Sequence, residues 1–93
     1  MVKHMVFWNL REDCDKDVAA AQMREALERL VGIVPGLQSA EVRRCYSGYD
    51  VALYSELVDR AAVEGYQVHP EHLAAKEIVH RYAIARVSCD YEV

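Results

Sequence analysis

Residues 2–10 have the alternation of a β-strand, because successive side chains of a strand point to opposite faces. One face carries mostly large apolar groups with a single histidine among them: Val2, His4, Val6, Trp8 and Leu10. The other face is also partly apolar, at Met5 and Phe7. We therefore expect both faces of this strand to be covered at least in part.

A helical spacing follows a short polar loop. Apolar residues recur there at steps of three and four: Ala20, Met23, Leu27, Leu30 and Val34. Asp15 precedes this stripe and predicts an N-cap, because its carboxylate can accept hydrogen bonds from the first backbone N–H groups. Pro35-Gly36 predicts the end of the helix.

Two strands and a break between two helices are predicted next. Residues 37–46 and 49–57 have strand patterns, and Ser47-Gly48 between them predicts a short hairpin connection. Asp59 predicts the cap of a short helix that ends at His69-Pro70. Proline disfavours helical geometry in the preceding residue but suits the first turn of a new helix.

The new helix is expected over residues 71–82, and residues 83–93 predict a last strand. One face of that strand carries small, apolar and aromatic groups: Ala83, Ala85, Val87, Cys89, Tyr91 and Val93. The order β-α-β-β-α-β is that of a ferredoxin-like α+β fold, with an antiparallel four-stranded sheet and helices on one face. The length predicts a single domain over residues 1–93.

The uncovered face of such a sheet predicts a partner. Apolar side chains on both faces of the first strand would leave an exposed patch larger than a monomer usually tolerates. We therefore expect a homodimer through the sheet face, which makes a dimeric α+β barrel.

Composition and charge exclude several other partners. The formal net charge is −4, from 11 basic and 15 acidic residues, and the bases are scattered among acids, so nucleic-acid binding is not expected. No apolar run approaches the ~20 residues that span a bilayer, and the N-terminus lacks a signal-peptide cleavage site. Cys14, Cys45 and Cys89 are widely spaced and predict reduced thiols. We expect a cytoplasmic protein with no membrane partner.

The stretch YQVHPEHLAAKE, residues 66–77, contains two of the four histidines. The imidazole of His72 can take a proton from a carbon next to a carbonyl, and the phenol of Tyr66 can donate to the enolate oxygen that develops. His4 needs a hydrogen-bond partner on its apolar face, and His72 or Tyr66 is a candidate. Alternatively, His72 is a helix-corner histidine bonded to a backbone carbonyl, and Tyr66 is a core residue.

His69 is interpreted first as the cap of the helix that begins at Pro70. A zinc site at His69, His72 and His4 is disfavoured because Pro70 disturbs the helix that would bring the imidazoles together. We expect no metal site and no cofactor, although a weak Mg²⁺ contact at a loop carbonyl stays open.

Several segments carry a resemblance to a known family: VKHMVFW, VPGL, YDVALYSEL, YQVHPEHL and the terminal DYEV. Over essentially its whole length the chain resembles the stress-responsive A/B barrel (Dabb) family, which implies a dimeric α+β barrel. In a polyketide cyclase of that family the key groups match His72, Tyr66 and His4 here. The aromatic residues of the cyclase's acyl pocket are replaced by residues such as Met23 and Leu27, which argues against the same substrate.

Two functions are therefore expected as alternatives. The first is binding or transformation of a small hydrophobic carbonyl compound in a cleft between helices and sheet, by a cofactor-free cyclase, lyase or isomerase. His72 would be its base, with Tyr66 and His4 orienting the carbonyl. The expected ligand-binding residues are Trp8, Met23, Leu27 and His69. The second is a non-enzymatic stress-response dimer with structural histidines. A cofactor-free monooxygenase is a third option, on fold analogy.

Overall fold

The computed structural model describes all residues, 1–93. The elements in chain order are β1 (Val2–Leu10), α1 (Lys16–Glu28), β2 (Leu37–Arg44), β3 (Val51–Leu57), α2 (Arg60–Val68), α3 (Pro70–His80) and β4 (Ala83–Glu92). The four strands form one antiparallel sheet in the order β2-β3-β1-β4. The predicted ferredoxin-like α+β fold is confirmed, including the division of the second helical region at His69.

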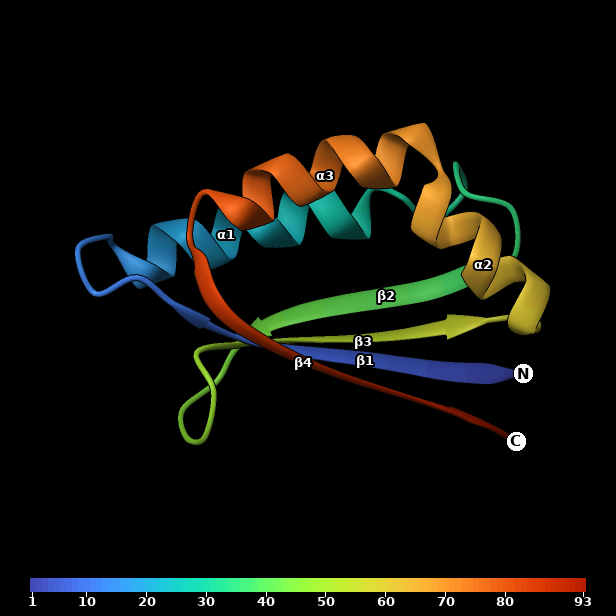
Figure 1. Cartoon of the computed structure of the whole chain (residues 1–93), viewed down its shortest axis with the longest axis horizontal. Helices are drawn as coiled ribbons and strands as arrows, with labels where there is room; N and C mark the ends of the chain where they lie inside the picture. The colour runs from blue at the N-terminus through green and yellow to red at the C-terminus, as the bar shows by residue number, and fades with distance from the viewer.

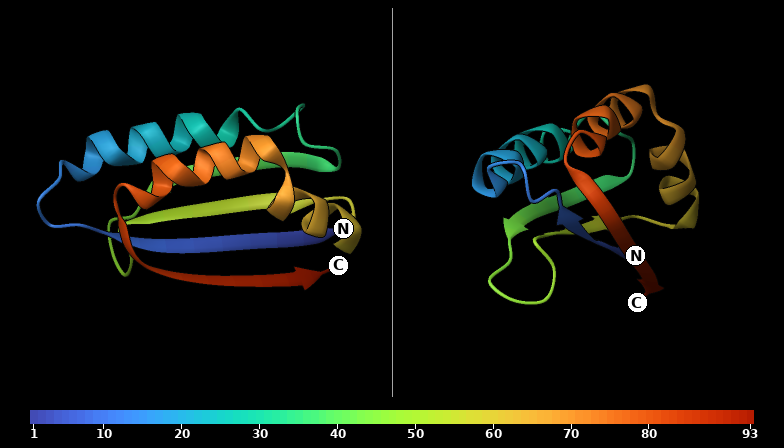
Figure 2. Two further views of the ribbon diagram at one scale, coloured as in Figure 1. Left: turned by 45° about the horizontal axis from the view of Figure 1, so that its top comes forward. Right: turned by 60° about the vertical axis from the view of Figure 1, so that its left-hand side comes forward.

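The helices form one layer and the sheet forms the other (Figure 1). The helices α1 and α3 lie side by side over one face of the sheet, and α2 lies at the end where both chain termini are found (Figure 2). The opposite face of the sheet has no helix on it. β4 is the edge strand next to β1, and every residue after Ala83 in it is exposed. The helical layer therefore covers three strands and leaves the fourth open.

Both predicted aspartate caps are present. The carboxylate of Asp15 accepts hydrogen bonds from the backbone N–H groups of Asp17 and Val18, at 3.0 and 3.1 Å. The carboxylate of Asp59 accepts from the backbone N–H of Ala62 at 2.8 Å. These bonds satisfy N–H groups that have no partner within the first turn of a helix.

The first helix ends earlier than predicted. Its last residue is Glu28, well before Pro35-Gly36, and Leu30 and Val34 lie in the turns that follow it. Arg29 is the C-cap, and Gly32 in the turns after it adopts φ +89°, a left-handed conformation that glycine adopts at little cost and that prevents the helix from resuming. Leu30 and Val34 are still buried, at 0% and 3% exposed, so the apolar spacing identified core residues correctly beyond the helix itself.

The last strand does not keep the single face that its alternation predicted. The pairing of β1 with β4 shifts between Asn9 and Leu10, so Leu10 pairs with Ala83 while Asn9 pairs with Ala85. Ala83 consequently packs against the core, and Ala85 lies on the open face. The prediction that both alanines share one face was wrong because a bulge cannot be read from alternation alone.

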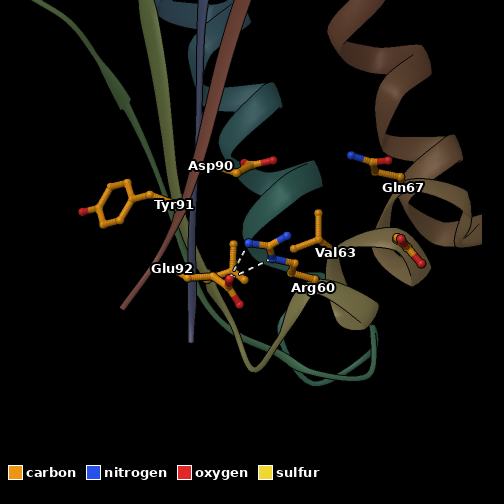
Figure 3. A pocket seen from close by; sticks show the side chains of 8 residues that line it. Arg60, Val63, Gln67, Asp90, Tyr91 and Glu92 are labelled. Carbon is orange, nitrogen blue, oxygen red and sulfur yellow. Dashed lines mark hydrogen bonds and ion pairs between the residues drawn. The ribbon is translucent and has the colours of Figure 1, made fainter.

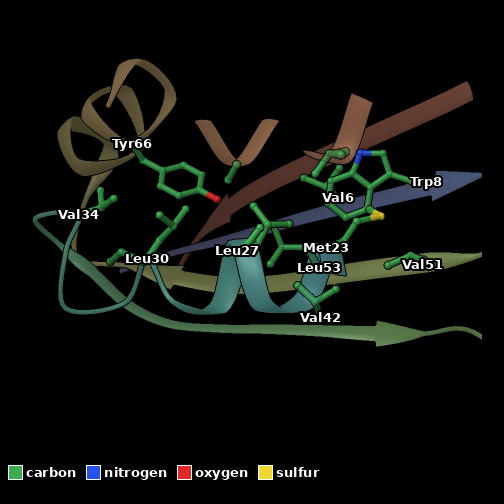
Figure 4. Close-up of a cluster of buried hydrophobic side chains, with 14 of the residues drawn as sticks. Val6, Trp8, Met23, Leu27, Leu30, Val34, Val42, Val51, Leu53 and Tyr66 are labelled. Carbon is green, nitrogen blue, oxygen red and sulfur yellow. The ribbon is translucent and has the colours of Figure 1, made fainter. Parts of the chain in front are cut away.

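The core fills the space between the helices and the sheet. Twenty buried apolar residues form one cluster. Figure 4 shows Met23 and Leu27 of α1 pointing toward Val6 of β1 and Leu53 of β3. Tyr66 of α2 enters the same space from the end of the layer. Because this cluster joins all the elements except most of β4, it sets the position of the helices over the sheet.

One aspartate ties the start of β3 to the end of β1. The carboxylate of Asp50 accepts a hydrogen bond from the backbone N–H of Leu10 at 2.7 Å and lies 3.2 Å from the ammonium nitrogen of Lys16. The hydrogen bond from Leu10 holds the pKa of Asp50 below its usual range, with Lys16 and Arg44 acting in the same direction against desolvation. Asp50 thus clamps the sheet beside the bulge.

We expect Asp50→Ala to lower the free energy of unfolding by about 1–3 kcal/mol at neutral pH, because the N–H of Leu10 loses its partner. Urea unfolding followed by circular dichroism measures this loss. Asp13→Ala is the matched control, since Asp13 pairs only with exposed Arg11, and it should change stability by no more than about 0.5 kcal/mol. Equal losses in the two variants would contradict the clamp.

Candidate functional site

A cavity of about 130 Å³ lies between the sheet and the ends of α2 and α3. Its twelve lining residues come from every element except β2: His4, Val6, Trp8, Leu27, Leu53, Tyr66, Gln67, His72, Lys76, Val79, His80 and Arg86. The three residues expected to be catalytic, His4, Tyr66 and His72, all line it. The fold therefore brings together side chains from opposite ends of the chain, since β1 lies beneath the helix corner.

The rings of Tyr66 and His72 stack on each other. Their centroids are 3.9 Å apart and their planes differ by 21°. The two residues lie on either side of the break between α2 and α3, where His69 has an extended backbone conformation. This break turns the chain so that one ring from each helix meets the other above the sheet.

His4 enters the cavity from β1 and is 4% exposed. Its ring meets Tyr66 edge-on, with centroids 5.9 Å apart and planes at 70°. Its Nδ1 pairs with the carboxylate of Asp90, which lies opposite His4 in the pairing of β1 with β4. The partner of His4 is thus Asp90, and not His72 or Tyr66 as the sequence led us to consider.

Asp90 is the residue of this group that sequence reasoning missed. The sequence feature that could have identified it is the polar face of the last strand. Polar residues alternate there with small and apolar ones, at Arg86, Ser88, Asp90 and Glu92. Only the register of β1 against β4 shows which of them faces His4.

Burial makes both stacked rings neutral near pH 7. Desolvation lowers the pKa of His72 to about 4, and nearby Lys76 lowers it further, against the backbone carbonyls of Tyr66 and Gln67. Desolvation also raises the pKa of Tyr66 to about 12, against the charge of Arg86. The Nδ1 atom of His72 is fully buried and has no hydrogen bond of normal geometry, although the ring lies close to the backbone carbonyls of Tyr66 and Gln67. A neutral imidazole and a neutral phenol therefore face one cavity.

The four expected ligand-binding residues divide into two groups. Trp8 and Leu27 line the cavity. Met23 is fully buried in the apolar core and is not among the lining residues. His69 lies outside the cavity and caps α3, because its Nδ1 accepts a hydrogen bond from the backbone N–H of Glu71 at 3.1 Å. The predicted capping role of His69 is present in the structure.

A second, more open hollow of about 400 Å³ lies beside the cavity, between α2 and β4. Figure 3 shows Arg60 of α2 paired with Glu92 of β4 across it, with the two side chains 2.6 Å apart at their closest. Asp90 and Gln67 also line this hollow, and Gln67 belongs to both spaces. The His4–Asp90 pair therefore lies at the boundary between an enclosed space and an open one.

Neither a metal-binding cluster nor a membrane-spanning helix is present. No group of three or more His, Cys, Asp or Glu side chains is arranged to hold a metal ion. No helix is long and apolar enough to cross a membrane.

One known protein family matches the chain over almost its whole length. The family model described as the stress responsive A/B barrel domain matches residues 2–93. The chain belongs to the stress-responsive A/B barrel domain family. No curated protein matches its sequence.

Solved structures share the A/B barrel domain's fold. A protein from Bacteroides fragilis, described as dimeric, ferredoxin-like and of unknown function, is 34% identical, with a TM-score of 0.89 over 99% of this chain and 95% of its own. A dimeric ferredoxin-like protein of unknown function from Thermobifida fusca is 23% identical, with a TM-score of 0.84 over 99% and 90%. The hydroxynitrile lyase of Passiflora edulis is 16% identical, with a TM-score of 0.83 over 99% and 93%. The relatives from Bacteroides fragilis and Thermobifida fusca are thus described as dimeric.

Acid should destabilise the protein through His72. Its folded pKa of about 4 lies below the ~6.5 of an unfolded chain, so the unfolded state binds more protons between these values. The resulting stability is fully present above pH ~6.5 and is lost as the pH falls toward ~4, by up to about 3 kcal/mol. Urea unfolding at a series of pH values measures the loss.

His72→Phe keeps a ring against Tyr66 but cannot titrate, so it should flatten the pH dependence in this window. His80→Gln on the same helix keeps His72 and should retain the wild-type slope. Equal losses of stability in His72→Phe and in the wild type between these pH values would show that His72 is not the group responsible.

Proposed function

We propose that this A/B barrel domain binds a small hydrophobic carbonyl compound in the cavity and transforms it by proton transfer at the carbon next to the carbonyl. Cyclisation, lyase and isomerase reactions all use such a step. The observation that carries the proposal is the convergence of His4, Tyr66 and His72 on one space that apolar side chains also line. A small-molecule site typically combines such a space with a few polar groups.

The chemical step assigns one role to each ring. The bond between hydrogen and the carbon next to the carbonyl breaks, and the proton passes to the imidazole of His72. The electron pair of that bond forms a double bond between the two carbons, the π pair of the carbonyl moves to its oxygen, and the resulting enolate oxygen accepts a hydrogen bond from the hydroxyl of Tyr66. His4, held by Asp90, orients the carbonyl end. No cofactor takes part in this step.

The pKa of His72 fits this role once a substrate is bound. A base of pKa about 4 is weak in the empty cavity, but it is unprotonated at neutral pH and so ready to accept a proton. The enolate that forms beside it is negatively charged, and a nearby negative charge raises the pKa of an imidazole. The base therefore becomes stronger as the reaction proceeds.

The second candidate function is a stress-response dimer with structural histidines. Two observations favour it: His69 caps α3, and the His4–Asp90 pair joins β1 to the edge strand β4. The position of His72 in the cavity lining, together with His4 and Tyr66, favours the first function. The fold of the Passiflora edulis hydroxynitrile lyase supports the view that this architecture can carry an enzyme site.

We also propose that a second copy of the chain covers the open face of the sheet. The apolar groups there include Met5 and Phe7 of β1 and Val87 and Tyr91 of β4, with Val87 and Tyr91 44% and 47% exposed. A patch of this kind on two adjacent strands favours a partner of the same shape. Relatives of this fold from two bacteria are described as dimeric, which supports the proposal.

The proposed reaction is tested by deuterium exchange. We expect the protein to accelerate exchange of the protons next to the carbonyl of cyclohexanone or 2-pentanone in D₂O, followed by proton NMR. His72→Phe should slow the protein-dependent exchange by about 100-fold or more, since a general base typically contributes 10²–10⁴-fold. Tyr66→Phe should also slow it, because the enolate loses its donor.

The matched control is His69→Asn, which changes a histidine on the same helix corner as His72 but keeps a good capping side chain. It should retain wild-type exchange. Exchange no faster than in buffer, or equally fast in His72→Phe, would favour the structural function instead. Circular dichroism of each variant distinguishes loss of chemistry from loss of fold.

The dimer is tested by Val87→Glu. A carboxylate in an apolar interface is left desolvated and unpaired, so this variant should sediment as a monomer where the wild type sediments as a dimer. Val18→Glu is the control, because Val18 is comparably exposed, at 51%, on the outer side of α1. It should remain a dimer. A dimer that survives Val87→Glu would place the interface elsewhere.

A further inference from the structure

We infer that the ligand of this cavity is an anion: a small carbonyl compound that also carries a carboxylate, which lies between Lys76 and Arg86. The inference rests on the proposed function for the location of the carbonyl end, but its charge argument is independent of any reaction. Among the twelve lining residues there is a lysine, an arginine and three histidines, and there is no Asp or Glu.

Lys76 and Arg86 stand out because they lack ion-pair partners. Eight of the eleven lysine and arginine side chains in the chain form an ion pair with a carboxylate. The other three are Lys76, Arg81 and Arg86, and two of these line the cavity. The closest polar contact of Arg86 is a hydrogen bond of 3.4 Å to the hydroxyl of Ser88. The protein pairs its cations elsewhere and leaves them free here.

The two cations approach the cavity from opposite sides. Lys76 lies on α3, one turn after His72, and Arg86 lies on β4 opposite Trp8. Their fields reach the rings: Lys76 lowers the pKa of His72, and Arg86 acts to lower the pKa of Tyr66. Asp90, the acid that pairs with the cavity residue His4, lines the neighbouring hollow rather than the cavity. The cavity therefore presents a positive field to whatever enters it.

The lining of the cavity also includes a buried polar ring, that of His72. His72 is 7% exposed, and its Nδ1 has no partner. The cations Lys76 and Arg86 line the same cavity as the His72 ring, and so do the apolar side chains of Val6, Leu53 and Val79. A ligand with a polar atom at one end, an apolar middle and a carboxylate at the other satisfies all three regions at once.

The volume limits the size of that ligand. The cavity measures about 130 Å³, and an apolar cavity of about 150 Å³ holds one benzene molecule. The apolar middle is therefore about one six-membered ring, or a chain of similar bulk, with the carboxylate extending into the mouth. Long acyl chains are excluded from the enclosed part of the site.

The test compares benzoate with benzamide, which have the same ring and nearly the same shape but differ in charge. Trp8 is the one tryptophan of the chain and lines the cavity, so its fluorescence measures occupancy directly. We expect benzoate to bind about tenfold or more tightly than benzamide, because charge-assisted hydrogen bonds from a lysine and an arginine are stronger than neutral ones. Added NaCl should weaken benzoate binding and leave benzamide binding nearly unchanged.

Variants assign the charge preference to the two cations. Arg86→Gln and Lys76→Gln should each weaken benzoate binding severalfold and alter benzamide binding by less than about twofold. Arg81→Gln is the matched control, because Arg81 is also unpaired but lies outside the cavity. It should bind both compounds like the wild type. Circular dichroism establishes that each variant is folded.

The outcomes separate this inference from the proposed reaction. Equal binding of benzoate and benzamide, or a benzoate preference that survives both substitutions, overturns the anion site while leaving ketone exchange to be judged by its own experiment. Failure of both compounds to perturb Trp8 at millimolar concentration also overturns it. A benzoate preference that depends on Arg86 and Lys76, in a protein with no ketone exchange, supports the anion site and rejects the proposed reaction.

Discussion

The interruption of the helix at His69-Pro70 is the constraint on which the cavity depends. Tyr66 and His72 are six positions apart, so on one continuous helix their side chains would point about 120° away from each other. The extended conformation of His69 ends α2, and Pro70 begins α3 in a new direction. Tyr66 and His72 can then stack at 3.9 Å, one from each helix. The histidine and proline of this corner are structural, and what they position is the candidate chemistry.

The same corner explains why the cavity opens toward β4. The helices α1 and α3 cover the strands β2, β3 and β1, and α2 lies at the end of the layer, so that no helix runs along β4 (Figures 1 and 2). The half of β4 that faces the helices is polar for this reason, at Arg86, Ser88, Asp90 and Glu92. An edge strand without a cover thus supplies Arg86 to a space that the other elements line with both apolar and polar side chains.

Much of this arrangement could be predicted from the sequence because it follows from local rules. The caps at Asp15 and Asp59, the break at Pro70 and the apolar face of β1 are each readable from a few neighbouring residues. The errors arose where a feature depends on distant pairing. Ala83 was assigned to the wrong face because the bulge opposite Asn9 and Leu10 is a property of two strands. Asp90 was missed as the partner of His4 for the same reason, since the two are 86 residues apart.

The unpaired Nδ1 of His72 bears most directly on the choice between a binding site and a structural corner. A buried polar atom without a partner is unfavourable, typically by about 1–3 kcal/mol, and side-chain packing alone would not favour keeping it. Replacement by an apolar ring would relieve both this penalty and the cost of desolvating the imidazole. His69, which is also a histidine of this corner, shows the other case, because its Nδ1 is satisfied by the backbone N–H of Glu71. His69 is thus used by the helix cap, whereas the ring of His72 stacks on Tyr66 in the lining of the cavity, where a ligand would meet it.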